Sequence, residues 1–432
     1  FWWGALLVFG WAAWPLLFAL FPGLADRGYG FAKVSGLLLV GWLAWLASSV
    51  RLPLWSQSGV LLALAAVALC SAAFVWPQRH ALRDYLRQHG ARLLWIEAIT
   101  LLAFAFFLII RLTNPDLWHP SFGGEKPMDF AYFNGVLRST VFPPIDPWHA
   151  NGYINYYYWG YVLVGSPVLL LGVEPSIAYN LIIPTLFALT GIGAFAVAYN
   201  AIAAWNARQA ARDAAHPAAN PWLAGLAALL LAVVLGNLDT PRVFVAEGLT
   251  RTGFYQQPQA LQEELVRQYS ASHGGAAPDN QALAAIIQQA LEESNSASAG
   301  AWRGLTRLLQ GQPLDIAPNR WYWAPTRILS EPPVNSGGAI VEMPFFTFLY
   351  GDLHAHMIAM PMMLLAMGFV LNEVLLAGRD PRKGRARWAA LAVGAGTIGL
   401  LRATNTWDWI TFTLLGVVGL AYAWWLVRGR LG

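Results

Sequence analysis

Nine segments of the chain are apolar over about the 20 residues that a helix needs to cross a lipid bilayer. They are residues 3–21, 31–49, 54–75, 93–110, 177–205, 222–238, 357–376, 388–401 and 409–427. A tenth apolar segment, residues 156–171, is shorter. The pattern predicts an all-α fold, a polytopic transmembrane helical bundle with about nine spans.

The basic loops predict the orientation of these spans, because Lys and Arg collect on the cytoplasmic side of membrane proteins. The most basic connections are residues 77–92 and 378–387, with a further basic cluster at 427–430. Placing them inside leaves residues 112–155 and 239–356 outside. The connection 206–220 is then inside only if the segment 156–171 enters the membrane without crossing it. The alternative is that residues 156–171 cross the membrane as a plain span. In that case either the arginines of residues 206–220 lie outside, against the distribution of Lys and Arg, or the number of crossings elsewhere no longer fits.

Composition supports this class of protein. Of the 432 residues, 57% are hydrophobic and only 12% are charged, which is too apolar for an ordinary soluble domain. The formal net charge of +4 is explained by the Lys and Arg residues of the basic loops, which set the membrane orientation. Because the chain has no long basic run, this charge does not indicate nucleic-acid binding. The single cysteine, Cys70, excludes an intrachain disulfide.

One external stretch, residues 239–336, is soluble in character and rich in Gln, Ser, Gly and Asn. Residues 258–294 predict two amphipathic helices joined by a Gly-rich turn, because apolar residues recur at spacings of three and four. We therefore expect four regions. These are N-terminal helices (1–92), a membrane module with the first external loop 112–155 (93–238), an external helical cap (239–338) and C-terminal helices (339–432).

Polar residues gather in four clusters at the external ends of apolar segments, where ionisable groups are costly and usually mark a functional site. The clusters comprise Glu125, Lys126, Asp129, Asp146 and His149; then Asn237 and Asp239; then Glu342, Asp352, His354 and His356; and last Arg402, Asn405 and Asp408. Their convergence on one face is the strongest functional indication in the sequence.

A chemical role is easiest to assign in the first cluster. Pro127 favours the first turn of a helix, which places Asp129 where backbone amides stabilise a carboxylate. Such a carboxylate can act as a general base or hold a metal, or it can simply cap the helix. The adjacent aromatic run, Tyr156, Tyr157 and Tyr158, is typical of an interfacial belt, or else lines a groove for a lipid head group or a sugar.

Asp352, His354 and His356 alternate, so their side chains converge only if the segment is extended. They form a candidate divalent-metal site, with Glu342 or Asp129 as a further ligand. Hydrogen-bonded histidines or phosphate contacts are the alternatives. Arg402 is either an interfacial anchor or a contact for a lipid phosphate. Arg320 and Arg327 are weaker candidates of the same kind. The sequence contains no P-loop, dinucleotide fingerprint, GxSxG or HExxH motif.

Five motifs together resemble the "YYY" family of bacterial and archaeal membrane proteins, over residues 26–409. They are "DRGYGFAKVSGLLLVGWLAWL", "GGEKPMDFAYFNGVLRSTVFPPIDPW", "INYYYWGY", "EMPFFTFLYGDLHAH" and "RATNTWDW". That family is similar in turn to the GT-C superfamily of membrane glycosyltransferases. The resemblance implies a multi-pass protein of the plasma membrane that takes sugars from polyprenyl-phosphate donors at the extracytoplasmic face. It also implies an acidic catalytic base in the first external loop, which is Asp129 here, with Glu125 as second choice.

The enzyme hypothesis is therefore transfer of a sugar from a lipid-linked donor to an unknown acceptor. The substrate would contact Lys126, His149, Tyr156, Tyr157, Tyr158, Arg402, Asn405 and Asp408, and Mg²⁺ or Mn²⁺ is the candidate cofactor. The alternatives are a transporter and a non-catalytic membrane scaffold or subunit. A transporter would place polar groups near the middle of its spans, whereas these spans are nearly free of charge in their interiors, which favours the enzyme.

Overall fold

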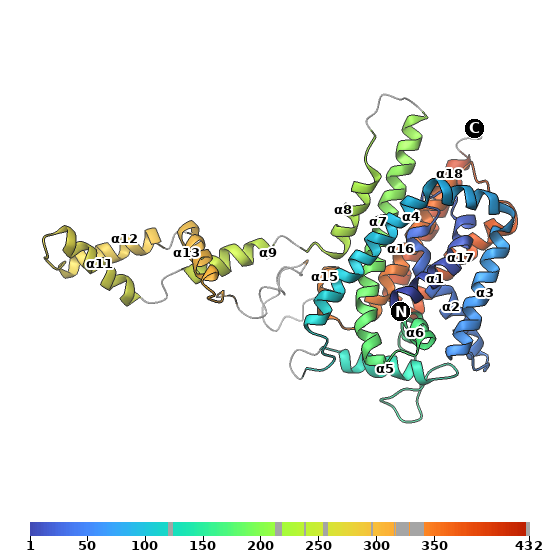
Figure 1. Ribbon diagram of the computed structural model, residues 1–432, viewed down its shortest axis with the longest axis horizontal. Helices are drawn as coiled ribbons and strands as arrows, with labels where there is room; N and C mark the ends of the chain where they lie inside the picture. Colours follow the sequence, from blue (N-terminus) through green and yellow to red (C-terminus); the bar gives the residue numbers. More distant parts are fainter. Residues whose placement is uncertain are drawn as a thin grey trace. The chain divides into compact units, whose positions relative to one another are not determined.

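A computed structural model describes residues 1–119, 124–211, 218–236, 239–253, 258–294, 297–314, 316, 328 and 341–428. The described residues form helices joined by turns, and no β-strand occurs among them beyond isolated bridges (Figure 1). The all-α prediction is therefore confirmed. Asn237, Arg320 and Arg327 lie outside the described residues.

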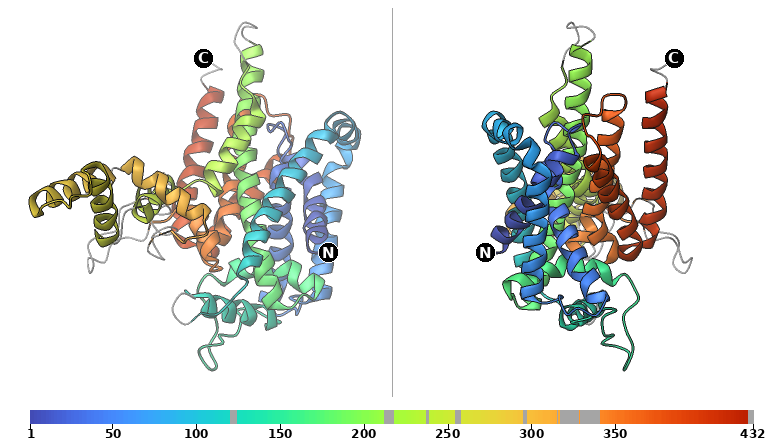
Figure 2. Two further views of the ribbon diagram at one scale, coloured as in Figure 1. Left: turned by 60° about the vertical axis from the view of Figure 1, so that its left-hand side comes forward. Right: turned by 90° about the vertical axis from the view of Figure 1, so that its right-hand side faces the viewer.

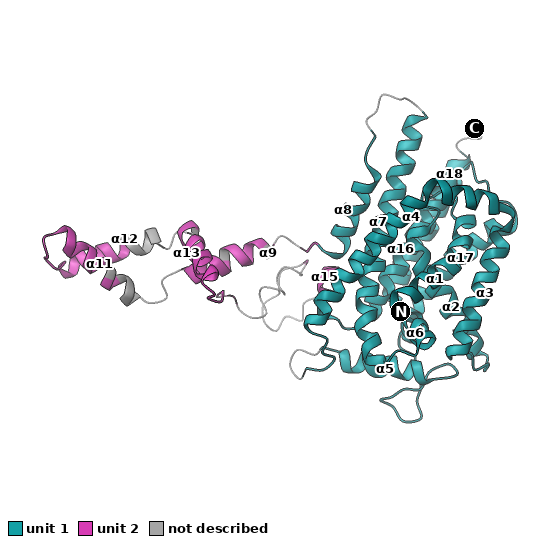
Figure 3. Ribbon diagram, viewed as in Figure 1, with its two compact units in different colours: residues 1–234, 347–432 teal, residues 235–346 magenta. Residues whose placement is uncertain are grey.

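The chain divides into two compact units (Figure 3). The first unit consists of residues 1–234 and 347–432, and the second consists of residues 235–346. The first unit thus contains the helices of the N-terminal region, those of the membrane module and those of the C-terminal region. Helix α15 (Pro344–Tyr350) extends across the boundary between the units in the sequence.

Helices of the first unit occupy all nine predicted apolar segments. They are α1 (Trp2–Leu20), α2 (Ala32–Ser49), α3 (Gln57–Val75), α4 (Arg79–Thr113), α7 (Pro175–Ala210), α8 (Pro221–Val233), α16 (Ala355–Leu376), α17 (Arg385–Thr404) and α18 (Thr406–Arg428). Two short 3₁₀ turns, η1 (Tyr29–Phe31) and η2 (Trp76–Gln78), precede α2 and α4, and two further helices are α5 (Lys126–Arg138) and α6 (Tyr158–Leu171).

The expected count of nine spans is not confirmed. Within the described residues, six helical stretches are long and apolar enough to cross a membrane: Trp2–Leu20, Tyr29–Ser49, Gln57–Thr113, Pro175–Ala210, Ala355–Leu376 and Thr406–Arg428. The stretch Gln57–Thr113 contains both α3 and α4. Helix α8 has only 13 residues, and α17 carries arginines near both ends, at Arg385 and Arg402.

The two ends of the first unit differ in character (Figures 1 and 2). The α3–α4 connection and the C-terminal ends of α7 and α18 lie at one end, shown at the top of Figure 1. Helix α5 lies at the other end. The basic connections 77–92 and 378–387 thus occupy the end opposite α5, as the charge pattern predicts.

Helix α6 begins and ends at the same end of the bundle. At its start, the hydroxyl of Tyr158 accepts a hydrogen bond from the Trp45 indole in the last turns of α2 (3.1 Å). At its finish, the Gln57 amide at the start of α3 donates to the carbonyl of Leu170 (3.0 Å). Because only a short connection separates α2 from α3, this buried helix does not run the length of the unit. Protein surrounds it, so its apolar residues need no direct contact with lipid.

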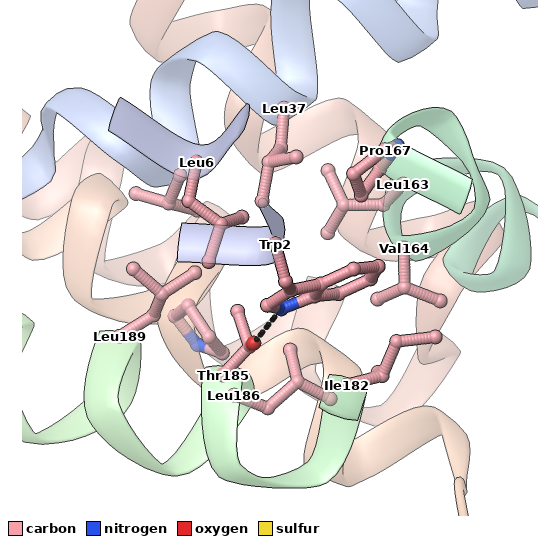
Figure 4. Close-up of a pocket in the computed structure, with 12 residues that line it drawn as sticks. Trp2, Leu6, Leu37, Leu163, Val164, Pro167, Ile182, Thr185, Leu186 and Leu189 are labelled. Carbon is pink, nitrogen blue, oxygen red and sulfur yellow. Dashed lines mark hydrogen bonds between the residues drawn. The ribbon is translucent and has the colours of Figure 1, made fainter. Parts of the chain in front are cut away.

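The core beneath α6 is closed. Figure 4 shows the Trp2 indole of α1 donating a hydrogen bond to the Thr185 hydroxyl of α7 (2.9 Å), among apolar side chains that include Val164 of α6. The cavity there has a volume of about 10 Å³, which is room for one water molecule at most. This contact region therefore holds α1, α6 and α7 together and is too small to bind a substrate.

The second unit contains α9 (Asp239–Pro241), a π-helical turn η3 (Arg242–Leu249), α10 (Thr250–Gly253), α11 (Pro258–Ser272), α12 (Asn280–Ser294) and α13 (Ala297–Leu309). The two predicted amphipathic helices are α11 and α12, and the turn between them has positive φ at Gly274 and Gly275. Helix α13 packs closely on α10, where a side chain on Gly253 would collide with the backbone of Gly300.

Candidate functional site

Helix α5 places Asp129 in its first turn, as predicted. The helix begins after Glu125, Pro127 lies in its first turn, and the Asp129 amide donates to the Glu125 carbonyl (3.0 Å). Asp129 is completely buried. Gly124, which precedes the helix, has a φ of 61°, and a Cβ there would lie 2.5 Å from a carboxylate oxygen of Asp352. Glycine thus allows the Asp352 carboxylate to approach and accept a hydrogen bond from the Glu125 amide (2.9 Å).

The segment before α16 lies outside any helix and is extended at His354, although the His354 amide also donates to the Asp352 carbonyl in a tight turn (2.8 Å). The Tyr179 hydroxyl fixes it by accepting a hydrogen bond from the Leu353 amide (2.8 Å) and donating to the Gly351 carbonyl (3.3 Å). Asp352 and His354 therefore point toward the start of α5. His356 already belongs to α16, and its Nε2 lies 3.2 Å from the Thr347 hydroxyl.

These two segments meet in a carboxylate cluster, defined here as Glu125, Lys126, Asp129, Asp352 and His354. The Nε2 atom of His354 lies 2.9 Å from Glu125 Oε2, 3.4 Å from Asp129 Oδ2 and 3.9 Å from Asp352 Oδ2. The Lys126 ammonium lies 3.0 Å from Asp352 Oδ1, and both side chains are nearly buried. Three carboxylates thus surround one imidazole, with one lysine as the neighbouring cation.

Asp129 has the properties of a base that works near neutral pH. Burial raises the pKa of this carboxyl to about 7, against the effects of nearby His354 and of the Tyr161 hydroxyl, which donates to Oδ1 (2.8 Å). The neighbouring Asp352 and Glu125 raise the pKa further. Among the described residues, the buried Oδ2 atom accepts no hydrogen bond. It is therefore positioned to receive a proton.

A cleft of about 440 Å³ adjoins this cluster. Its lining includes eight residues that the sequence analysis singled out: Glu125, Tyr156, Tyr157, Tyr158, His354, His356, Arg402 and Asn405. The Glu125 side chain is 61% exposed, whereas that of Asp129 has no exposed surface. Glu125 and His354 therefore face the cleft, and Asp129 lies behind them.

Cationic and aromatic groups complete the cleft. The Arg402 guanidinium lies over the Trp409 ring, 5.1 Å from its centroid. Tyr157 adopts a left-handed backbone with a φ of 30°, which is unusual for a residue with a side chain. Burial raises the pKa of Tyr157, so its hydroxyl remains a hydrogen-bond donor. Tyr158 instead stacks on Phe142, which makes it mainly a packing residue.

Other predicted site residues lie outside the cleft lining. His149 is exposed on the connection after α5, and Asp408 accepts a hydrogen bond from the Asn405 amide (2.7 Å), so it orients Asn405. Glu342 and Asp239 belong to the second unit, where Asp239 pairs with Arg242.

Two tyrosines of the site were missed by the sequence analysis. Tyr161 and Tyr179 lie within apolar segments, where a lone tyrosine is typical of packing. The available signal was the spacing of Tyr161, which follows Tyr157 by four residues and so shares its helix face.

Three members of the cluster fit a divalent metal. Asp129, Asp352 and His354 each offer one ligand atom, and these atoms lie within 4.8 Å of one another. Two carboxylate oxygens and one imidazole nitrogen form a donor set that suits a transition metal such as Mn²⁺ better than Mg²⁺, which prefers oxygen ligands. The expected ligands His356 and Glu342 are not part of this group.

An apolar groove lies between α16, α17 and α18 and has a volume of about 430 Å³. Small residues such as Ala395, Gly399 and Gly416 line it, together with Trp409. Arg402, which lines the cleft, lies over Trp409, so the groove and the cleft are neighbours at this contact.

Comparison with known proteins gives one match. The model of a family described as an uncharacterized membrane protein (DUF2298) matches residues 39–428. No curated protein and no solved structure matches the chain.

Proposed function

Since the chain belongs to the uncharacterized membrane protein family DUF2298, we propose that this membrane protein is a glycosyltransferase that uses a polyprenyl-phosphate sugar donor. The observation that carries the proposal is that a polar cleft and an apolar groove are neighbours in the first unit. Arg402 lines a polar cleft that also holds a carboxylate, Trp409 lines an apolar groove, and these two side chains are in contact. A lipid-linked sugar has the same two-part chemistry.

The donor fits this junction in one orientation. Its phosphate pairs with Arg402, whose guanidinium can donate two parallel hydrogen bonds to phosphate oxygens. Its isoprenoid tail follows the groove past Trp409 and Gly416, where small residues leave space. Its sugar then lies in the cleft, near the hydroxyl of Tyr157 and the amide of Asn405.

The reaction is a direct displacement at the anomeric carbon. Because the Glu125 side chain is 61% exposed, it can move aside and let an acceptor hydroxyl reach Oδ2 of Asp129. Asp129 takes the hydroxyl proton, the acceptor oxygen bonds to the anomeric carbon, and the bond from that carbon to the phosphate oxygen breaks. The lipid phosphate leaves with the bonding electrons beside Arg402, and the anomeric centre inverts.

A divalent metal held by Asp129, Asp352 and His354 would supply Lewis-acid stabilisation of negative charge in this site. The chain's own residues bind the donor and remove the proton. The basic connections, at the end of the unit opposite α5, favour a cytoplasmic location for that end. This supports an outward-facing cleft and a reaction at the extracytoplasmic face of the plasma membrane.

The test is a transfer assay in nanodiscs with a panel of radiolabelled polyprenyl-phosphate sugars and mixed acceptors. We expect transfer by the wild type, strong loss in Asp129→Asn, and full activity in Glu174→Gln. Glu174 is a matched control because it is exposed just before α7, outside the cleft. A folded wild-type protein that transfers sugar from none of the donors would contradict the proposal.

A further inference from the structure

A second pocket, distinct from the cleft, lies at the opposite end of the first unit. It has a volume of about 510 Å³ and is lined by the α1–α2 connection, the first half of α4, the last turns of α7 and the end of α16. Its polar lining includes Arg27, His89, Arg92 and Arg379. We call it the basic pocket. Helix α16 separates it from the cleft by 22 residues, or about 33 Å along the helix.

The arginines of the basic pocket carry positive charge that no described carboxylate neutralises by direct pairing. Arg27 lies over the ring of Phe18, 5.0 Å from its centroid. Arg92 donates to the Ala25 carbonyl (2.7 Å), and Arg379, just after α16, donates to the Leu375 carbonyl in the last turn of that helix (3.3 Å). Among the described residues, these three arginines form no ion pair and no acidic residue lines the pocket. Three guanidinium groups without a direct ion pair around one cavity favour a bound anion.

Hydrogen bonds hold the α1–α2 turn, which forms one wall of the basic pocket, in a defined conformation. The buried carboxylate of Asp26 accepts hydrogen bonds from the amides of Gly28 and Gly30 (3.0 Å each) and from the Asn200 side chain (2.9 Å). These bonds hold the α1–α2 turn against α7 and occupy the one buried acid nearby. Arg27, within this turn, has a φ of 54°, a conformation that a non-glycine residue adopts only where the surroundings impose it.

Much of the remaining lining is apolar. Leu375 and Leu376 of α16 and Ala203, Ala204 and Ala207 of α7 face the same space as the arginines. A ligand that fits must therefore combine a negatively charged group with apolar chains. Phosphate diesters of membrane lipids have this composition, and their head groups lie at the depth where membrane-spanning helices end.

We propose that the basic pocket binds the phosphate group of an anionic phospholipid on the side of the membrane opposite the cleft. Arg27 and Arg379 pair with the phosphate, while the leucines and alanines contact the upper part of the acyl chains. This site is independent of sugar transfer, since none of its residues lies in the cleft.

The experiment measures lipid retention by native mass spectrometry of the full chain released from detergent. The probes are phosphatidylglycerol, phosphatidylcholine, and inorganic phosphate as a competitor. The test variant is Arg27→Gln/Arg379→Gln, and the matched control is Arg83→Gln/Arg87→Gln, which removes two exposed arginines of α4 outside the pocket. We expect one tightly held phosphatidylglycerol, with affinity lower by about fivefold for each pocket arginine removed.

Three outcomes would overturn the proposal: equal retention of phosphatidylcholine, equal losses in the test and control variants, or displacement of the lipid by millimolar phosphate with stoichiometric phosphate binding. The last outcome would identify a site for a soluble phosphate. If the double variant does not fold, Arg379→Gln alone decides the question, because this side chain is exposed and, among the described residues, its one hydrogen bond goes to the Leu375 carbonyl at the end of α16.

Discussion

The pH dependence of stability tests the description of Asp129 without any knowledge of the substrate. Burial raises the pKa of this carboxyl from 3.8 to about 7 in the folded protein. The folded state therefore binds the proton more tightly than the unfolded state does. The stability that protonation confers is complete below about pH 4 and is lost as the pH rises to about 7. A difference of this size corresponds to about 4 kcal/mol, since each pKa unit is worth 1.36 kcal/mol.

The substitution Asp129→Asn removes the charge and keeps an oxygen for the Tyr161 hydroxyl to donate to. We therefore expect the variant to be no more stable than the wild type at pH 4 and clearly more stable at pH 8.5, with a Tm higher by several degrees. The assay is thermal unfolding in detergent across this pH range, with a chelator present so that no metal occupies the cluster. A variant that is equally destabilised at both pH values would refute the claim that Asp129 is a buried carboxyl with a raised pKa.

Three further predictions concern the cleft, the metal and the opposite end of the unit. Arg402→Gln should lower kcat/KM for the lipid-linked donor by about 10- to 100-fold without changing Tm, because one charge-assisted contact is lost; steady-state kinetics over donor concentration would show it, and an unchanged value would remove Arg402 from the site. Chelation should lower the rate of transfer, and added Mn²⁺ should restore it, because the metal stabilises negative charge in the site. Asp352→Asn or His354→Gln should weaken Mn²⁺ binding measured by calorimetry. A calorimetric signal unchanged in both variants would argue against these ligands. Asp26→Ala should destabilise the protein by about 3 kcal/mol, because two buried amides lose their acceptor, and a Tm equal to that of the wild type would contradict the hydrogen-bond network.

The sequence predicted the helices well because their signals are local. Long apolar segments, a proline at the start of α5 and an alternating Asp352–His354 pattern each depend on a few neighbouring residues. The convergence of Glu125, His354, Arg402 and the tyrosines on one cleft also followed, because ionisable groups at helix ends collect on one face of a membrane bundle.

Long-range packing was beyond the sequence analysis. The contact between Tyr161 and Asp129, and the contact that fixes the extended segment through Tyr179, join helices that lie far apart in the chain. His356 was expected to bind a metal with His354, but α16 begins between the two and turns His356 toward Thr347. The basic pocket also depends on long-range packing, because the α1–α2 connection meets α4, α7 and the end of α16 there, and no single motif predicts it.

The most direct test of the central claim is photo-crosslinking of the donor. A polyprenyl-phosphate sugar with a photoreactive group in its first isoprene unit would be bound to the protein in nanodiscs, and the crosslinked peptides identified by mass spectrometry. We predict crosslinks to residues 402–420, which fall strongly in Arg402→Gln and remain in Arg385→Gln, an exposed arginine at the other end of α17. Crosslinks spread over α1 to α4, or unaffected by Arg402→Gln, would contradict the claim that the donor binds where the cleft meets the groove.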